Sequence, residues 1–135
     1  MKILLPILML VFSNQAQADD LRWTCFVSKD QKKPIHLAFA FASATKGAQV
    51  SYKNGSGAIR LVQKRVESIE MAEGRPHEFT YEYEELINGI TGGKYTVVFQ
   101  GAIFYKFDYQ AKGKPRNYRF VMDPESQNDG KCTWQ

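Results

Sequence analysis

Apolar and polar residues alternate along most of the chain, in short runs that are separated by turn-forming residues. An alternation with a period of two predicts β-strands that bury one face. In residues 77–85, for example, Phe79, Tyr81 and Tyr83 alternate with polar side chains. The strands expected on this basis cover residues 21–28, 34–42, 49–53, 58–66, 77–85, 94–100, 102–110, 117–122 and 131–134.

Glycine-containing segments mark the boundaries between these runs. Residues 54–57, which read Asn-Gly-Ser-Gly, predict a tight hairpin because glycine adopts positive φ values at no steric cost. Gly101 suggests a bulge or a tight bend between two strands, and residues 67–76 fit either a strand extension or a short helical turn. The side chains expected to face inward are Ile35, Leu37, Phe39, Phe41, Phe79, Tyr81, Tyr83, Tyr95, Val97, Phe99, Ile103, Tyr105, Phe107 and Tyr109.

This pattern predicts an all-β protein of seven to nine strands with no long helix. Many short antiparallel strands in one small domain form either a closed or nearly closed barrel or a barrel-like sandwich. We favour the barrel, because closure removes the sheet edges that would otherwise be exposed.

The first 18 residues have the features of a cleaved export signal. Lys2 gives a positive start, residues 3–12 are almost wholly apolar, and Ala16-Gln17-Ala18 supplies the small residues that signal peptidase requires. The apolar run is too short to span a membrane, which takes about 20 residues. Removing these 18 of the 135 residues leaves 117, which we expect to form a single domain, 19–135, in a periplasmic or secreted protein.

Cys25 and Cys132 are the only cysteines, and they lie near the two ends of the expected mature chain. A pair of cysteines in an exported protein is expected to form a disulfide. On the chain-entropy model, a disulfide that closes so long a loop contributes roughly 4 to 5 kcal/mol. The termini of the domain should therefore lie side by side.

Charged residues are distributed unevenly. Without Lys2, 17 basic and 14 acidic residues remain, a net charge of +3. Residues 66–85 contain seven glutamates and one arginine, whereas residues 106–119 contain five basic residues and one acidic residue. The sequence therefore predicts a bipolar molecule whose separated fields can steer a charged partner. Within the acidic segment, Glu78, Glu82 and Glu84 are the candidates for an exposed electrostatic patch.

Catalytic chemistry is not apparent in the sequence. His36 and His77 do not suffice for a zinc site, and no serine lies in a nucleophile motif. The alternating Glu82 and Glu84 fit a solvated strand face better than a glycosidase pair. We therefore expect a protein that is not an enzyme, uses no metal or cofactor, and does not bind nucleic acid.

Four segments resemble one known family. Trp23-Thr24-Cys25, residues 49–54 (Gln-Val-Ser-Tyr-Lys-Asn), residues 91–95 (Thr-Gly-Gly-Lys-Tyr) and Lys131-Cys132 are similar to the small periplasmic inhibitors of C-type lysozyme and the related adhesin complex protein. Those proteins have a signal peptide, a small antiparallel barrel, a cysteine near each end, and an inhibitory loop of the form S-G-x-x-Y.

The resemblance implies a protein that blocks a muramidase, or a toxin-like hydrolase, by inserting a rigid loop into the enzyme cleft. The partner-binding residues would then be Thr91, Gly92, Gly93, Lys94 and Tyr95, with the Thr91 hydroxyl and the Lys94 ammonium facing the catalytic carboxylates. Thr91 stands where the family has serine, and residues 67–85 would be an insertion relative to the shorter members.

Two other functions are compatible with the sequence. One is a lipocalin-like carrier with Phe39, Phe41, Tyr81, Tyr83, Phe99, Tyr105 and Phe107 around a small apolar ligand. The other is an envelope adhesion or structural module that binds another surface protein through an exposed strand edge.

Overall fold

The computed structural model describes residues 21–42 and 47–135, in which all regular secondary structure is β. The proposed signal peptide, residues 1–18, lies outside the described residues. The strands are β1 (Thr24–Ser28), β2 (His36–Ala42), β3 (Gly47–Tyr52), β4 (Ala58–Ile69), β5 (Glu78–Ile87), β6 (Ile90–Gln100), β7 (Ile103–Gln110), β8 (Asn117–Met122), β9 (Gln127–Asn128) and β10 (Lys131–Cys132).

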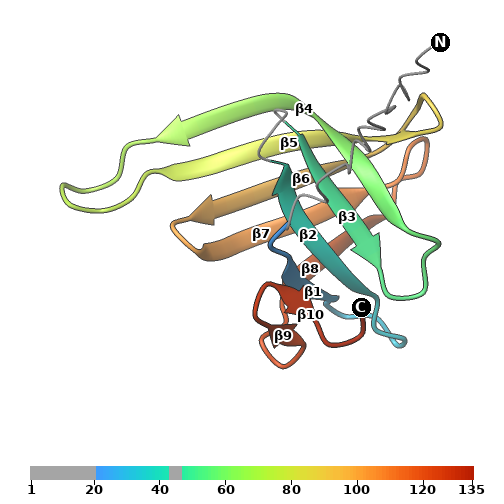
Figure 1. Cartoon of the computed structure of the whole chain (residues 1–135). Coiled ribbons are helices and arrows are strands. Elements are labelled where there is room, and N and C mark those ends of the chain that lie inside the picture. Colours follow the sequence, from blue (N-terminus) through green and yellow to red (C-terminus); the bar gives the residue numbers. More distant parts are fainter. Residues whose placement is uncertain (1–20, 43–46) are drawn as a thin grey trace, which may run out of the picture.

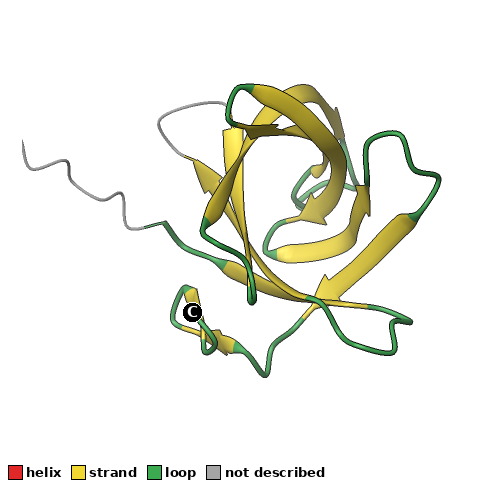
Figure 2. Ribbon diagram, turned by 90° about the vertical axis from the view of Figure 1, so that its right-hand side faces the viewer, coloured by secondary structure: helices red, strands yellow, loops and turns green. Residues whose placement is uncertain are grey.

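Strands β1 to β8 form a closed barrel in which each strand pairs antiparallel with the next, and β8 returns to pair with β1. Figure 2 shows the ring of strands nearly end on. The short strands β9 and β10 form a separate ribbon beside β1. The predicted all-β antiparallel barrel is therefore confirmed.

The disulfide between Cys25 and Cys132 is also confirmed. It joins β1 to β10 across a sequence separation of 107 residues, with the two Cα atoms 5.8 Å apart. Both half-cystines are buried with Ala38, and Trp23 and Trp134 pack against them. A disulfide of this kind is typical of proteins that fold in an oxidising compartment outside the cytoplasm.

Aromatic and branched side chains fill the barrel. The Phe26 and Phe107 rings lie 4.5 Å apart, and Phe39 contacts both Phe107 and Tyr83. The fully buried side chains of this core include Phe26, Leu37, Phe39, Val50, Leu61, Tyr83, Tyr95, Val97 and Phe107. The alternation in the sequence placed most of these residues correctly, because side chains on a strand point alternately to its two faces.

Two of the expected inward residues face outward instead. The register of β6 and β7 shifts between Val98 and Phe99, so that Phe99 pairs with Phe104 rather than with Tyr105. Phe104 therefore packs against the core, while Ile103 and Tyr105 are 55% and 60% exposed. A β-bulge inserts one extra residue and reverses the alternation beyond it, which is why the strict period of two failed here.

Strands β4 to β7 continue beyond the barrel as a twisted sheet, here called the arm, which extends to the left in Figure 1. Residues 67–69, whose structure the sequence left open, belong to β4 and therefore to the arm. The inner face of the arm is aromatic: the Phe99 ring stacks on Phe79 and Tyr81, each at 5.6 Å, and lies 5.3 Å from Phe41. No helix within residues 21–42 and 47–135 is long and apolar enough to cross a membrane.

Candidate partner-binding surface at the basic end of the barrel

Four connections, at residues 29–35, 53–57, 88–89 and 111–116, lie at the end of the barrel opposite the arm, because alternate turns of an up-and-down barrel share one end. They lie on the right in Figure 1. We call this the basic end, because these connections contain seven basic residues and a single acidic one, Asp30. The basic residues are Lys29, Lys32, Lys33, Lys53, Lys112, Lys114 and Arg116.

A buried carboxyl group lies inside the barrel near this end. Glu85 of β5 is only 6% exposed. Its Oε1 accepts hydrogen bonds from the Gly93 backbone N–H at 2.9 Å and from the Tyr109 hydroxyl at 2.8 Å, and its Oε2 accepts one from the Tyr95 hydroxyl at 3.4 Å. The Tyr95 hydroxyl also lies 2.5 Å from that of Tyr52. The network thus links β3, β5, β6 and β7.

Burial and the Glu85 charge change the acidity of these phenols. The pKa of Tyr52 is raised to about 12, mainly by burial, and the nearby Glu85 charge adds to the increase. Burial also raises the pKa of Tyr95 and of Tyr109, and the hydrogen bond to Glu85 contributes at Tyr109. All three phenols therefore stay protonated at neutral pH and can donate hydrogen bonds.

Gly92 and Gly93 lie directly beside the Glu85 and Tyr109 side chains of this network. The pairing of β5 and β6 shifts register between Glu84 and Leu86, where Gly92 and Gly93 stand opposite Glu85. A Cβ atom on Gly93 would lie 2.6 Å from the Tyr109 hydroxyl oxygen and would overlap its ring, and one on Gly92 would lie 3.1 Å from Oε1 of Glu85. A side chain at Gly93 would therefore displace the Tyr109 ring, whereas one at Gly92 would require Glu85 to move by only a few tenths of an ångström.

The five residues expected to form an inhibitory loop lie in a strand. All of Thr91 to Tyr95 belong to β6, and the turn before them is only Asn88-Gly89. The positive φ values of those two residues, 51° and 78°, are those of a type I′ hairpin turn. Asn-Gly between apolar residues is a strong hairpin signal, and it could have located this turn from the sequence.

The strand divides the five residues between two environments. Gly93 and Tyr95 are buried, Gly92 is half-buried, and Thr91 and Lys94 are exposed. Thr91 and Lys94 line a pocket of about 460 Å³ that Lys112 also borders, and the Lys112 ammonium donates a 3.1 Å hydrogen bond to the Thr91 carbonyl. The structure thus brings the exposed Thr91 hydroxyl and Lys94 ammonium of β6 together, around one pocket, with the Lys112 ammonium of the connection between β7 and β8.

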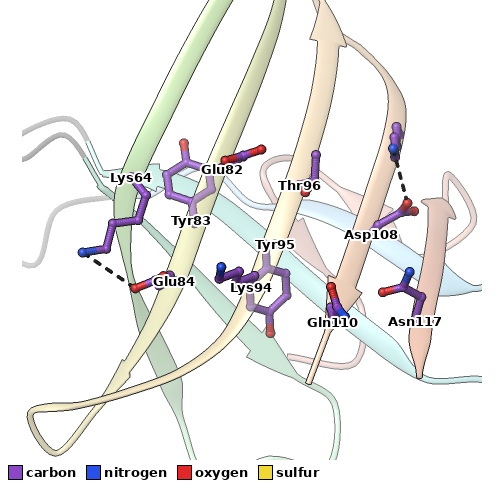
Figure 3. Close-up of a pocket in the computed structure, with 11 residues that line it drawn as sticks. Lys64, Glu82, Tyr83, Glu84, Lys94, Tyr95, Thr96, Asp108, Gln110 and Asn117 are labelled. Atoms are coloured by element: carbon purple, nitrogen blue, oxygen red, sulfur yellow. Dashed lines mark ion pairs between the residues drawn. The ribbon is translucent and has the colours of Figure 1, made fainter. Parts of the chain in front are cut away.

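The glutamates of the predicted acidic patch lie on the outer face of β5. Glu82 and Glu84 line a neighbouring pocket of about 310 Å³ together with Lys94, as Figure 3 shows. Glu82 lies 3.6 Å from the Arg65 guanidinium and Glu84 lies 3.7 Å from the Lys64 ammonium, both on β4. All three glutamates, Glu78 included, are half-buried, and the charge of two of them is balanced by cations of β4.

Within residues 21–42 and 47–135, no group of three or more His, Cys, Asp or Glu side chains is placed to hold a metal ion. Glu85 is occupied by its own hydrogen bonds. The exposed donors around the Thr91 pocket are the Thr91 hydroxyl and the ammonium groups of Lys94 and Lys112, which can recognise carboxylates or other anions.

Comparisons with protein-family models, with curated proteins and with solved structures find no match to this chain.

Proposed function

We propose that the protein is an exported inhibitor that binds a peptidoglycan-cleaving hydrolase, either a lysozyme-like muramidase or a toxin of the same class. The observation that carries this proposal is the presentation of Thr91 and Lys94. Both side chains are exposed on β6. Gly93, which lies between them, and Tyr95, which follows Lys94, donate hydrogen bonds to the buried Glu85 carboxylate. A preorganised surface loses little entropy when it docks.

The chemistry of the target supports the same assignment. Glycoside hydrolases typically act through a pair of carboxyl groups about 5 to 10 Å apart. The Thr91 hydroxyl and the ammonium groups of Lys94 and Lys112 are donors suited to such a pair. The cations of the basic end would also steer an enzyme with an acidic cleft. The signal-like residues 1–18 and the disulfide favour an encounter in the periplasm or outside the cell.

The test is a titration of the oxidised protein against a panel of animal and bacterial muramidases, followed by lysis of cell-wall substrate. We expect stoichiometric inhibition of at least one enzyme. Thr91→Ala together with Lys94→Ala should raise the inhibition constant about 100-fold or more, because two hydrogen bonds to charged groups are lost and each contributes about 1.5 to 3 kcal/mol.

The matched control is Lys131→Ala together with Thr133→Ala, which removes the same two residue types from exposed positions near the C-terminus. This control should inhibit like the natural sequence. Substitution of Gly92 is a poor test, since any Cβ there approaches Glu85. Absence of inhibition across the panel would refute the target class. Full inhibition by the folded Thr91→Ala, Lys94→Ala variant would refute the surface.

One observation favours a second function, the carrier. A pocket of about 430 Å³ opens at the arm end of the barrel, lined by Phe41, Tyr81, Tyr83 and Phe99 among others. Pockets for small apolar ligands are typically lined by aromatic side chains in this way. A ligand that stays bound in native mass spectrometry, and is lost in Phe99→Glu, would support the carrier.

A further inference from the structure

Among the strands that the structure describes, the outer part of β4 forms an edge of the arm. Strand β3 pairs with β4 only as far as Gly47, which lies opposite Val62, whereas β4 continues to Ile69. From Arg65 onwards, its only partner among the described strands is β5. Strand β2 ends at the same level as β3, because Ala42 pairs with Gly47. The backbone of β4 from Arg65 to Ile69 thus offers hydrogen-bonding groups to a further strand.

The side chains along this edge are accessible on both faces. Val66 is 46% exposed and pairs with Tyr81 on the aromatic inner face, and Ile69 is 54% exposed. Arg65 and Glu67 lie on the outer face, where they form an ion pair with each other and Arg65 also approaches Glu82. Proteins often protect free edges with charged side chains, especially lysine, which repel a second copy of the same edge. Here the two charges next to Val66 have opposite signs.

This charge order makes the edge complementary to itself. If two copies of β4 pair antiparallel with Val66 at the centre, each Arg65 lies opposite the Glu67 of the other copy, and the two Val66 side chains meet. Opposite charges and β-branched pairs directly across a sheet are both favourable. Centring the pair on Arg65 or on Glu67 instead would place that residue opposite its own copy, which is repulsive.

We propose that the protein forms a two-fold symmetric dimer through the β4 edge, with Val66 on the symmetry axis. The interface is isologous and closed, so it ends at two chains. Because the axis runs perpendicular to the sheet, the aromatic inner faces of both arms lie on one side of a continuous sheet. The two basic ends then point in opposite directions, which leaves each free to bind a separate partner.

Sedimentation equilibrium of the oxidised protein tests the dimer. We expect a dimer at about 100 µM that dissociates on dilution, because interfaces of modest area often have micromolar dissociation constants. Glu67→Arg and Arg65→Glu should each raise the dissociation constant at least 10-fold, since each places like charges opposite one another. A sample that stays monomeric at every concentration would overturn the proposal.

An equimolar mixture of these two variants provides the sharper test. One chain then carries two cations beside Val66 and the other carries two carboxylates, so the mixture should form a heterodimer that neither variant forms as a homodimer. A mixture that stays monomeric would overturn the register. Arg60→Glu and Glu73→Arg make the same charge reversals outside the edge, since Arg60 pairs with β3 and Glu73 lies in the turn between β4 and β5. Both controls should dimerise normally.

Cross-linking tests the position of the axis independently of affinity. Residues directly opposite in an antiparallel pair have Cα atoms about 4.5 to 5.5 Å apart, within reach of a disulfide. Val66→Cys should therefore give a covalent dimer on mild oxidation. Ser68→Cys should not, because its nearest partner position is Lys64 of the other chain. Equal cross-linking of both variants would contradict the proposed axis.

Discussion

At the residue scale, the buried Glu85 accounts for the nearby glycines and tyrosines, because these residues surround its carboxylate. A buried carboxyl group is costly unless its oxygens are hydrogen-bonded. Here the backbone N–H of Gly93 and the hydroxyls of Tyr95 and Tyr109 supply three donors. The Tyr109 ring occupies the space where a Gly93 side chain would be, and the Glu85 side chain lies close to the position of a Gly92 side chain.

Gly93→Ala should therefore lower the free energy of unfolding by about 1 to 3 kcal/mol, the usual range for overpacking. The physical reason is the overlap of the new Cβ with the Tyr109 ring. Urea denaturation, followed by tryptophan fluorescence, measures the change. In a Tyr109→Ala background the same substitution should cost markedly less, because the clashing ring is gone. An equal cost in both backgrounds would contradict this explanation.

The sequence predicted neither the burial of Glu85 nor the packing of Gly92 and Gly93 against Glu85 and Tyr109. Glu85 follows Glu82 and Glu84 in an acidic segment, and nothing in the alternation distinguishes it from a solvated residue. Its burial depends on a bulge between β5 and β6 and on hydroxyl groups from β3, β6 and β7. Those partners come together only when the barrel closes.

At the element scale, the Tyr52, Tyr95, Glu85 and Tyr109 network connects four strands that meet at the basic end. Strands β3 and β6 are not neighbours in the barrel, yet Tyr52 and Tyr95 join them across its interior. The network gives β6 a fixed position. This is the property on which the proposed presentation of Thr91 and Lys94 depends.

The network also predicts how stability depends on pH. The pKa of Tyr52 is about 12 in the folded protein, against 10.0 for a freely solvated tyrosine such as that of the unfolded chain. Between these values the unfolded chain binds fewer protons than the folded one, so stability falls as pH rises. The contribution is present in full below pH 10 and is lost as pH rises through the folded pKa. The urea midpoint should therefore decrease between about pH 10 and 12.

Tyr52→Phe isolates this effect. The variant lacks the titrating hydroxyl, so its urea midpoint should decrease less steeply over the same pH range than that of the natural sequence. Every other residue is the same in the two proteins, so the difference between their slopes measures the contribution of Tyr52. An identical slope in the two proteins would show that Tyr52 does not contribute to alkaline unfolding.

At the scale of the whole molecule, the charged residues are concentrated at the basic end and along the arm, whereas the disulfide lies between β1 and β10. The predicted bipolarity corresponds to a basic end on four connections and to glutamates along the arm, although Lys64 and Arg65 balance part of the acidic charge. The disulfide joins the first barrel strand to the C-terminal ribbon. It therefore holds a segment that pairs with no barrel strand.

Replacing both half-cystines, Cys25→Ala with Cys132→Ala, should lower the free energy of unfolding by about 2 to 5 kcal/mol, as for other native disulfides in small domains. The main reason is the entropy that the unfolded chain regains when the 107-residue loop opens. Urea denaturation of the variant and of the reduced natural protein should give similar midpoints. A loss below about 1 kcal/mol would contradict this role for the disulfide.

The sequence by itself determined the features that repeat locally or depend on a single pair of residues. Strict alternation specified most strands and their buried faces, and two cysteines allowed a single disulfide. The tertiary structure alone decided where that alternation breaks, at the bulges opposite Glu85 and beside Tyr105, since a bulge depends on how two strands align. It also decided that β4 extends beyond β3 and that, among the described strands, only β5 pairs with its outer part, because strand length is visible in the sequence but the end of pairing is not.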